Sequence, residues 1–162
     1  MPVAYLGVGS NLNAEDNVRL AFRELHERFS VEQVSTVYQS KALGFEGTDF
    51  LNAVVCVATE LSPHDLCAQL ELIHELAGRR RRPDKFVART LDIDLLLYDR
   101  LVVDEPPVRL PRNDVLQFSF VLRPLAEVAP DYRHPVTGKS LSEHWQQFDA
   151  ASHPLTAVDI VL

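Results

Sequence analysis

Two aspartates separated by one residue, Asp92 and Asp94, are the side chains of this sequence best suited to chemistry. They lie in a mainly apolar stretch, residues 90–98, that predicts a β-strand. Because side chains alternate along a strand, both carboxylates should point to the same face. Two carboxylates held side by side repel each other unless a cation lies between them. Oxygen ligands of this kind suit Mg²⁺, which completes its shell with water and substrate phosphates, so the spacing indicates a magnesium and phosphate site.

A basic segment comes immediately before these aspartates. Its cations are Arg79, Arg80, Arg81, Arg82, Lys85 and Arg89. Guanidinium groups bind phosphate oxygens through paired hydrogen bonds and stay charged at any working pH. Phosphoryl transfer needs metal ions, cations near the developing charge and an aligned nucleophile, so the two features together favour such a reaction. The alternative is a solvated run of surface arginines beside two aspartates in ordinary ion pairs.

The composition narrows the class of protein. The chain has 162 residues, a net charge of −7 and 46% hydrophobic residues, which predicts one domain, residues 1–162, with a substantial core. An acidic chain with one cationic segment predicts a small anionic ligand rather than nucleic acid. We find no apolar run near the ~20 residues that span a bilayer and no secretory pattern, so we expect a cytoplasmic protein with no membrane partner. Cys56 and Cys67 should be buried thiols.

Hydrophobic periodicity predicts the elements that must position these residues. We expect strands at 3–9, 31–39, 50–59 and 90–98, an edge strand at 101–104, and helices at 17–29, 62–78 and 118–128. Asp16 or Asn17 should cap the first helix and Ser62 the second, which Gly78 should end. The order of the main elements is that of the ferredoxin-like βαββαβ arrangement, an antiparallel sheet with helices on one face. We therefore predict an α+β fold with a mostly irregular C-terminal extension.

The sequence resembles a known enzyme family. Arg-Thr-Leu-Asp-Ile-Asp at 89–94, Gly-Arg-Arg-Arg at 78–81 and Val-Ala-Tyr-Leu-Gly-Val-Gly-Ser-Asn-Leu at 3–12 are similar to motifs of 6-hydroxymethyl-7,8-dihydropterin pyrophosphokinase, and the likeness runs from Val3 to Pro130. The resemblance implies transfer of a diphosphate group from ATP to 6-hydroxymethyl-7,8-dihydropterin in folate biosynthesis, with AMP as the other product. It also implies a ferredoxin-like fold, two Mg²⁺ ions and an ATP site without a Walker-type loop, a motif that is absent here.

The resemblance assigns residues to the metal and to ATP. Asp92 and Asp94 match the aspartates that bridge the two ions, and with Arg79 and Arg89 they form the expected catalytic set. The residues expected to contact ATP are Arg79, Arg81, Arg89, Leu110 and Arg112.

The resemblance also assigns a pterin pocket. Its expected residues are Ser40, Leu43, Phe50, Asn52, Phe86 and Phe120. Asn52 can offer a donor and an acceptor to the edge of the pterin, while Phe50 and Phe120 can stack on its ring. Without the resemblance, the two phenylalanines would be taken for core aromatics, whereas an asparagine in an apolar strand needs hydrogen-bond partners.

Several positions depart from the family pattern near the expected site. They are Phe86-Val87-Ala88 in place of Trp-Gly-Pro, Arg112 in place of histidine, Phe118 in place of arginine, His74 in place of glutamate and Lys41 in place of proline. Two alternatives therefore stay open: a divergent enzyme acting on another pterin-like alcohol, and a module that binds pterin or nucleotide without transfer. We expect the protein to be a monomer.

Overall fold

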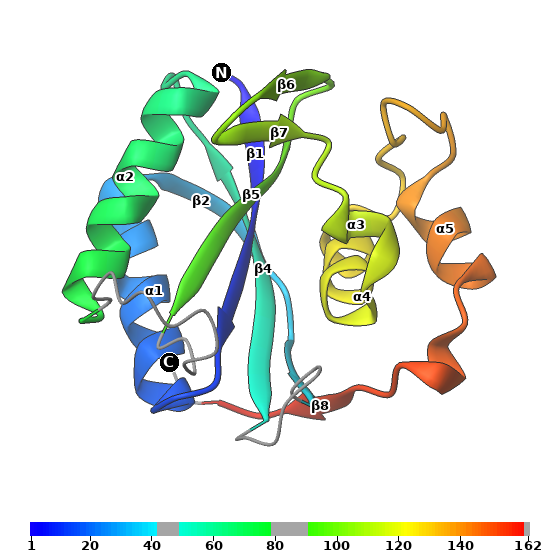
Figure 1. Ribbon diagram of the computed structural model, residues 1–162, viewed down its shortest axis with the longest axis horizontal. Helices are drawn as coiled ribbons and strands as arrows, with labels where there is room; N and C mark the ends of the chain where they lie inside the picture. The colour runs from blue at the N-terminus through cyan, green and yellow to red at the C-terminus, as the bar shows by residue number, and fades with distance from the viewer. Residues whose placement is uncertain (42–48, 79–90, 161–162) are drawn as a thin grey trace.

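The computed structural model describes residues 1–41, 49–78 and 91–160. Its largest unit is an antiparallel sheet with the strand order β5-β1-β4-β3-β8, in which β2 also pairs with β4 (Figure 1). The strands are β1 (Val3–Ser10), β2 (Ser30–Val34), β3 (Val37–Ser40), β4 (Phe50–Ala58), β5 (Asp92–Tyr98) and β8 (Thr156–Val158).

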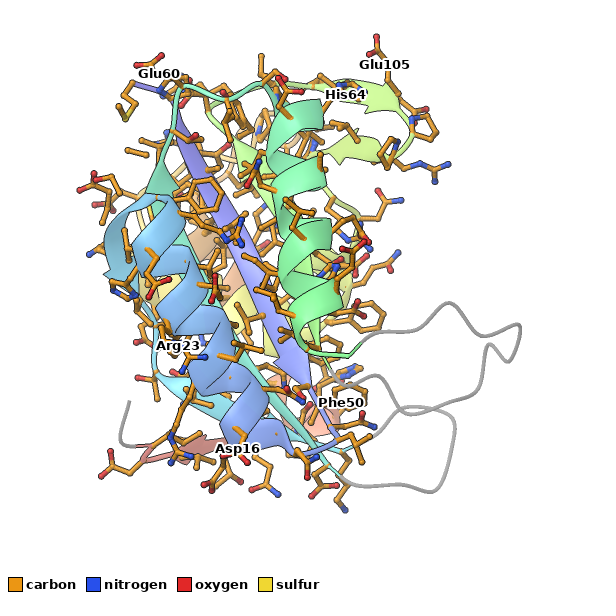
Figure 2. All side chains as sticks on the ribbon, turned by 90° about the vertical axis from the view of Figure 1, so that its left-hand side faces the viewer. Asp16, Arg23, Phe50, Glu60, His64 and Glu105 are labelled. Carbon is orange, nitrogen blue, oxygen red and sulfur yellow. The ribbon has the colours of Figure 1, made fainter. Side chains whose placement is uncertain are left out.

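One face of the sheet is covered by α1 (Ala14–Arg28) and α2 (Pro63–Leu76), which both lie in front of the sheet in Figure 2. Their apolar stripes form one core cluster with inward side chains of the strands, to which Leu25 of α1, Leu66 of α2 and Ile93 of β5 belong. Removal of this apolar surface from water is what holds the two layers together.

The other face is covered by α4 (Ser119–Val128), against which α3 (Asp114–Gln117) and α5 (Leu141–Gln147) pack, on the opposite side of the sheet in Figure 1. The two helices of the βαββαβ unit thus share one face, as predicted, while the helices that follow β5 add a layer on the other face, which was not predicted. Val54 of β4 and Leu96 of β5 belong to a second core cluster with these helices. A sheet that is apolar on both sides needs a cover on each.

The order β1, α1, β2 and β3, β4, α2, β5 confirms the predicted ferredoxin-like arrangement. The predicted strand at 31–39, however, is two strands that both pair with β4. Ser35 separates them, because its hydroxyl oxygen accepts a hydrogen bond from the Val54 N–H at 2.8 Å in place of a ladder carbonyl. β8, which periodicity did not predict, extends the sheet beside β3.

The start of α1 differs from its prediction. The helix begins at Ala14 rather than Asn17, and its N-cap is Asn13, in the left-handed conformation with φ 45° and ψ 46°. The side chain of Asn17 lies inside the first turn and donates a hydrogen bond to Leu12 O at 2.7 Å. Neither Asp16 nor Asn17 is therefore the cap.

The ends of α2 agree with their prediction. The Ser62 hydroxyl oxygen accepts a hydrogen bond from the Asp65 N–H at 3.1 Å, and Pro63 occupies the first turn. Gly78 follows the last turn with a φ of +79°, a conformation that glycine adopts without strain.

The segment after β5 is more regular than predicted. β6 (Val103–Glu105) and β7 (Val108–Leu110) form a separate two-stranded ribbon instead of an edge strand of the main sheet. The helix predicted at 118–128 is confirmed as α4. The short helix α3, which was not predicted, comes before it, and Phe118 separates the two because its backbone is extended, with φ −123° and ψ 130°.

Glu127 fixes α4 against the sheet. Its carboxylate accepts hydrogen bonds from the Tyr38 hydroxyl at 2.6 Å and from the Thr36 N–H and hydroxyl at 2.8 and 2.9 Å. The Arg123 guanidinium lies over the Tyr38 ring, 4.7 Å from its centroid. These contacts hold α4, and with it Phe120, at a defined distance from β3 and β4.

Cys56 is buried and Cys67 is half-buried, and both are free thiols. The prediction of buried thiols is therefore confirmed for Cys56 and wrong for Cys67. In the described ranges, no helix is both long enough and apolar enough to cross a membrane.

Candidate active site

Asp92 and Asp94 point to the same face of β5, as their spacing predicts. Ile93, between them, is 2% exposed and belongs to the core under α1 and α2, so the two carboxylates project from the opposite face. In the register with β1, Asp92 lies opposite Gly9 and Asp94 opposite Gly7. The carboxylates therefore stand beside two positions that carry no side chain.

Gly7 and Gly9 form part of the floor next to the aspartates, with Leu96 packed close to Gly7 and Asn52 close to Gly9. A Cβ atom on Gly7 would lie 3.2 Å from Leu96 Cδ1, and one on Gly9 would lie 3.5 Å from Asn52 Oδ1. Among the described glycines, positive φ occurs at Gly78 and Gly138, so the two glycines of β1 do not serve a turn. Their lack of side chains makes room between β1, β4 and α4.

This room is a cavity of about 260 Å³ between the sheet and α4, here called the α4 cavity. It brings together predicted pterin residues from three elements and the two aspartates of β5. The pterin residues are Ser40 of β3, Phe50 and Asn52 of β4, and Phe120 of α4, and the aspartates are Asp92 and Asp94. Lys41 also lines the cavity, whereas the predicted pterin residues Leu43 and Phe86 lie outside the described residues.

Asn52 is the buried polar group of the α4 cavity, with 5% of its surface exposed. Its Nδ2 donates hydrogen bonds to Ser40 Oγ at 2.8 Å and to Tyr38 O at 3.3 Å. Both amide hydrogens are thus used within the protein, and Oδ1 faces the open position at Gly9. The side chain is oriented to offer an acceptor, which refines the expectation of a donor and an acceptor.

Phe120 is held by a second aromatic ring. Phe118 stacks against it with a centroid separation of 5.0 Å and an interplanar angle of 14°. Phe118, which departs from the family pattern, therefore supports one wall of the α4 cavity. Phe50, labelled in Figure 2, comes from the start of β4 and contributes to the same cavity.

A second cavity of about 470 Å³ lies between α2, β5 and β7, here called the α2 cavity. Its lining includes His64, Leu70 and His74 of α2 and Arg109 of β7. Figure 2 shows His64 at one end of α2, close to Glu105 of the β6–β7 ribbon, and their side chains approach to 4.0 Å.

The two cavities meet at Asp92, Asp94 and Arg112, which line both. A ligand in the α4 cavity and a ligand in the α2 cavity would therefore share the same two carboxylates and the same guanidinium. This is the arrangement that a group transfer between two bound molecules requires.

Arg112 lies between two acidic side chains. Its Nη2 is 3.8 Å from Asp94 Oδ1 and its Nε is 3.4 Å from Asp114 Oδ2. Asp114, which also lines the α4 cavity, was not predicted from the sequence; its position two residues after Arg112 was the available signal. Leu110 is 3% exposed and lines a different cavity, of about 510 Å³, so the structure does not bring it to the α2 cavity.

The charges at this junction favour a bound cation. Burial raises the pKa of the Asp94 carboxyl above its ordinary value; Arg112 lowers it, while the charges of Asp92 and Asp114 raise it further. In the described part of the chain, no group of three or more His, Cys, Asp or Glu side chains is arranged to hold a metal. The pair Asp92–Asp94 fits a cation that takes one or two carboxylates and keeps water and phosphate ligands, which is the habit of Mg²⁺.

Three predicted ATP residues, Arg79, Arg81 and Arg89, lie outside the described residues. The residues that the structure brings together from the metal and ATP predictions are thus Asp92, Asp94 and Arg112.

The sequence is similar to that of one enzyme family over most of its length. Residues 5–130 match the sequence model of the family described as 7,8-dihydro-6-hydroxymethylpterin-pyrophosphokinase. The chain is 37% identical over 145 residues to the 2-amino-4-hydroxy-6-hydroxymethyldihydropteridine pyrophosphokinase of Aquifex aeolicus, covering 88% of this chain and 90% of that protein. It is 39% identical to the protein of the same name from Pseudomonas aeruginosa, covering 86% of this chain and 87% of the relative.

The fold also matches solved structures. Wild-type Plasmodium falciparum HPPK-DHPS with pterin and p-hydroxybenzoate superposes with a TM-score of 0.75 over 93% of this chain at 14% identity. This chain spans 43% of the length of that protein, so the likeness concerns the fold of the matched part of that protein.

Proposed function

The chain belongs to the 7,8-dihydro-6-hydroxymethylpterin-pyrophosphokinase family, and we propose that it transfers a diphosphate group from ATP to 6-hydroxymethyl-7,8-dihydropterin. The products are AMP and the pterin diphosphate, and the reaction is a step of folate biosynthesis. In this transfer the pterin hydroxyl oxygen forms a bond to the β-phosphorus, the bond from that phosphorus to the oxygen of the α-phosphate breaks, and the hydroxyl proton is released to water.

The observation that carries this proposal is the junction of the two cavities at Asp92, Asp94 and Arg112. We assign the pterin to the α4 cavity, where aromatic side chains and a buried amide are available, and ATP to the larger α2 cavity. The hydroxymethyl group and the β-phosphate then meet beside the carboxylates. Alignment of nucleophile and phosphorus contributes much of the rate enhancement in phosphoryl transfer.

Asp92 and Asp94 are proposed to hold Mg²⁺, with two ions expected from the resemblance. When bound, Mg²⁺ neutralises phosphate charge and lowers the pKa of a coordinated hydroxyl. The chain's own contribution is to present both carboxylates from one strand face, next to the side-chain-free floor at Gly7 and Gly9.

The cations of the site are proposed to bind the phosphates. Arg112 lies close enough to the junction to reach them, and Arg79, Arg81 and Arg89 are assigned to them by the family motif. Arg79 and Arg89 complete the proposed catalytic set with the aspartates. Leu43 and Phe86 remain predicted pterin contacts. Leu110 lies outside the α2 cavity and is therefore not part of the proposed ATP site.

Replacing Asn52 with leucine should raise the KM for the pterin by about 10- to 100-fold, since an unmade hydrogen bond to a buried group costs about 1–3 kcal/mol. The KM for ATP should change by less than about threefold, because Asn52 does not line the α2 cavity. Steady-state kinetics with each substrate varied separately would measure both constants.

Gln33→Leu is the control for this substitution. Gln33 is an exposed residue of β2 that lies opposite Cys56 of β4, and it lines neither of the two cavities. The control makes a similar amide-to-leucine change and should leave both constants unchanged. An equal rise of both constants in Asn52→Leu would contradict the pterin assignment.

The proposed function is tested by AMP formation from ATP and Mg²⁺ with purified protein, with and without 6-hydroxymethyl-7,8-dihydropterin. AMP and pterin diphosphate that appear only with the pterin would support the proposal. Binding of pterin or ATP without AMP would indicate either a binding module or another acceptor alcohol, and a panel of pterin-like alcohols would separate the two. A cytoplasmic location and a monomeric state remain predictions.

A further inference from the structure

His74 of α2 makes a hydrogen bond near the start of β5, between the two aspartates assigned to the metal. The residue is 3% exposed, and its Nε2 accepts a hydrogen bond from the Ile93 N–H at 2.7 Å. Ile93 is the residue between Asp92 and Asp94. The imidazole is thus hydrogen-bonded to the backbone of the residue that lies between the two aspartates.

The position of β5 in the sheet explains why this bond matters. β5 is the first strand in the order of the sheet, paired with β1 on one side; among the described residues no strand pairs with its other side. The N–H of Ile93 points to that side, where a buried donor without an acceptor would destabilise the fold. His74 supplies from α2 the acceptor that a neighbouring strand would otherwise supply.

A contact of the second ring nitrogen, Nδ1, also fixes the orientation of the His74 imidazole. Nδ1 lies 3.2 Å from Glu71 Oε1, one turn earlier in α2. Because Nε2 accepts from Ile93, the proton of the neutral ring is on Nδ1, which donates to Glu71. Both nitrogens therefore have partners, and the imidazole has one orientation relative to β5.

We propose that His74 is a positioning residue of the metal site: by holding the Ile93 N–H, it sets the backbone of β5 so that Asp92 and Asp94 present their carboxylates at the spacing a shared cation requires. This proposal rests on the proposed function, which assigns the cation to these two aspartates. A rotation of the Ile93 backbone would change the distance between the two carboxylates, because Asp92 and Asp94 are the residues directly before and after Ile93.

Two substitutions of His74 separate positioning from packing. His74→Leu keeps an apolar side chain of similar size but removes the acceptor, while His74→Gln keeps an oxygen that can reach the place of Nε2. We expect His74→Leu to weaken Mn²⁺ binding about 10- to 100-fold, the usual effect of losing a partner that orients metal ligands, and His74→Gln to recover most of it. Free Mn²⁺ would be followed by electron paramagnetic resonance with protein and α,β-methylene-ATP, which cannot release AMP.

A second readout follows the hydrogen bond itself. The Ile93 amide should exchange with deuterium faster in His74→Leu than in the wild type or in His74→Gln, as observed by NMR. Leu66→Val is the matched control: it removes buried volume from the same helix, and it should lower the melting temperature without changing Mn²⁺ binding.

Mn²⁺ binding by His74→Leu that equals the wild type, or His74→Gln as weak as His74→Leu, would overturn the positioning role. Failure of the proposed function has a different signature. In that case wild type and Asp94→Asn would bind Mn²⁺ equally, whatever residue occupies position 74, and the assignment of the cation to β5 would be overturned.

Discussion

Asp94→Asn should lower the rate of AMP formation by at least about 10³-fold and leave the fold intact. The substitution keeps the shape of the side chain and removes the charge that a cation needs. Metal ions supply several kcal/mol of charge stabilisation in phosphoryl transfer, and each 1.36 kcal/mol is a factor of about ten. The rate of AMP release at saturating ATP, Mg²⁺ and pterin is the measurement.

The fold should tolerate this change. The Asp94 carboxylate is partly desolvated and lies near the charges of Asp92 and Asp114, so loss of its charge removes repulsion from the metal-free protein as well as the ion pair with Arg112. The melting temperature measured by circular dichroism should therefore stay close to that of the wild type. Asp104→Asn is a control, since this carboxylate is 87% exposed on β6; near-normal turnover in Asp94→Asn would refute the metal assignment.

Gly9→Val should strongly weaken pterin binding and leave ATP binding in place. Valine suits a β-strand, and the new Cβ would make an ordinary contact of 3.5 Å with Asn52 Oδ1. Its two methyl groups, however, would occupy the floor of the α4 cavity, where we place the pterin ring. Overpacking of this kind costs about 1–3 kcal/mol, so we expect the Kd for the pterin to rise by up to about 100-fold.

Isothermal titration with the pterin, and separately with α,β-methylene-ATP and Mg²⁺, would measure the effect of Gly9→Val. The Kd for the nucleotide analogue should change by less than about threefold, because Gly9 does not line the α2 cavity. Ala58→Val adds the same two methyl groups to the neighbouring strand at its far end, opposite Val3, and should bind the pterin normally. Unchanged pterin affinity in Gly9→Val would place the acceptor elsewhere.

Local features of this protein followed from the sequence by itself. The period of two along a strand placed Asp92 and Asp94 on one face, and β5 has them there. Ser62 and Gly78 marked the ends of α2 because capping and positive φ depend on a few adjacent residues. The motif at 89–94 identified the family, and the order of elements predicted the ferredoxin-like sheet.

Tertiary structure alone decided which residues meet. Sequence periodicity gave no sign that Ser35 would divide a strand, that β8 would join the sheet, or that helices would cover both faces. It also did not show that the amide hydrogens of Asn52 would be used by Ser40 and Tyr38.

The same holds for the site as a whole. Arg112 lies beside Asp94, and His74 beside Ile93, although 18 and 19 residues separate them along the chain. Backbone conformation depends on neighbours in the sequence, so short patterns can predict it. The partner of a buried hydrogen-bonding group or charge depends on how distant segments pack. That packing is set by burial of apolar surface throughout the core, so no single short segment of the sequence reveals the partner.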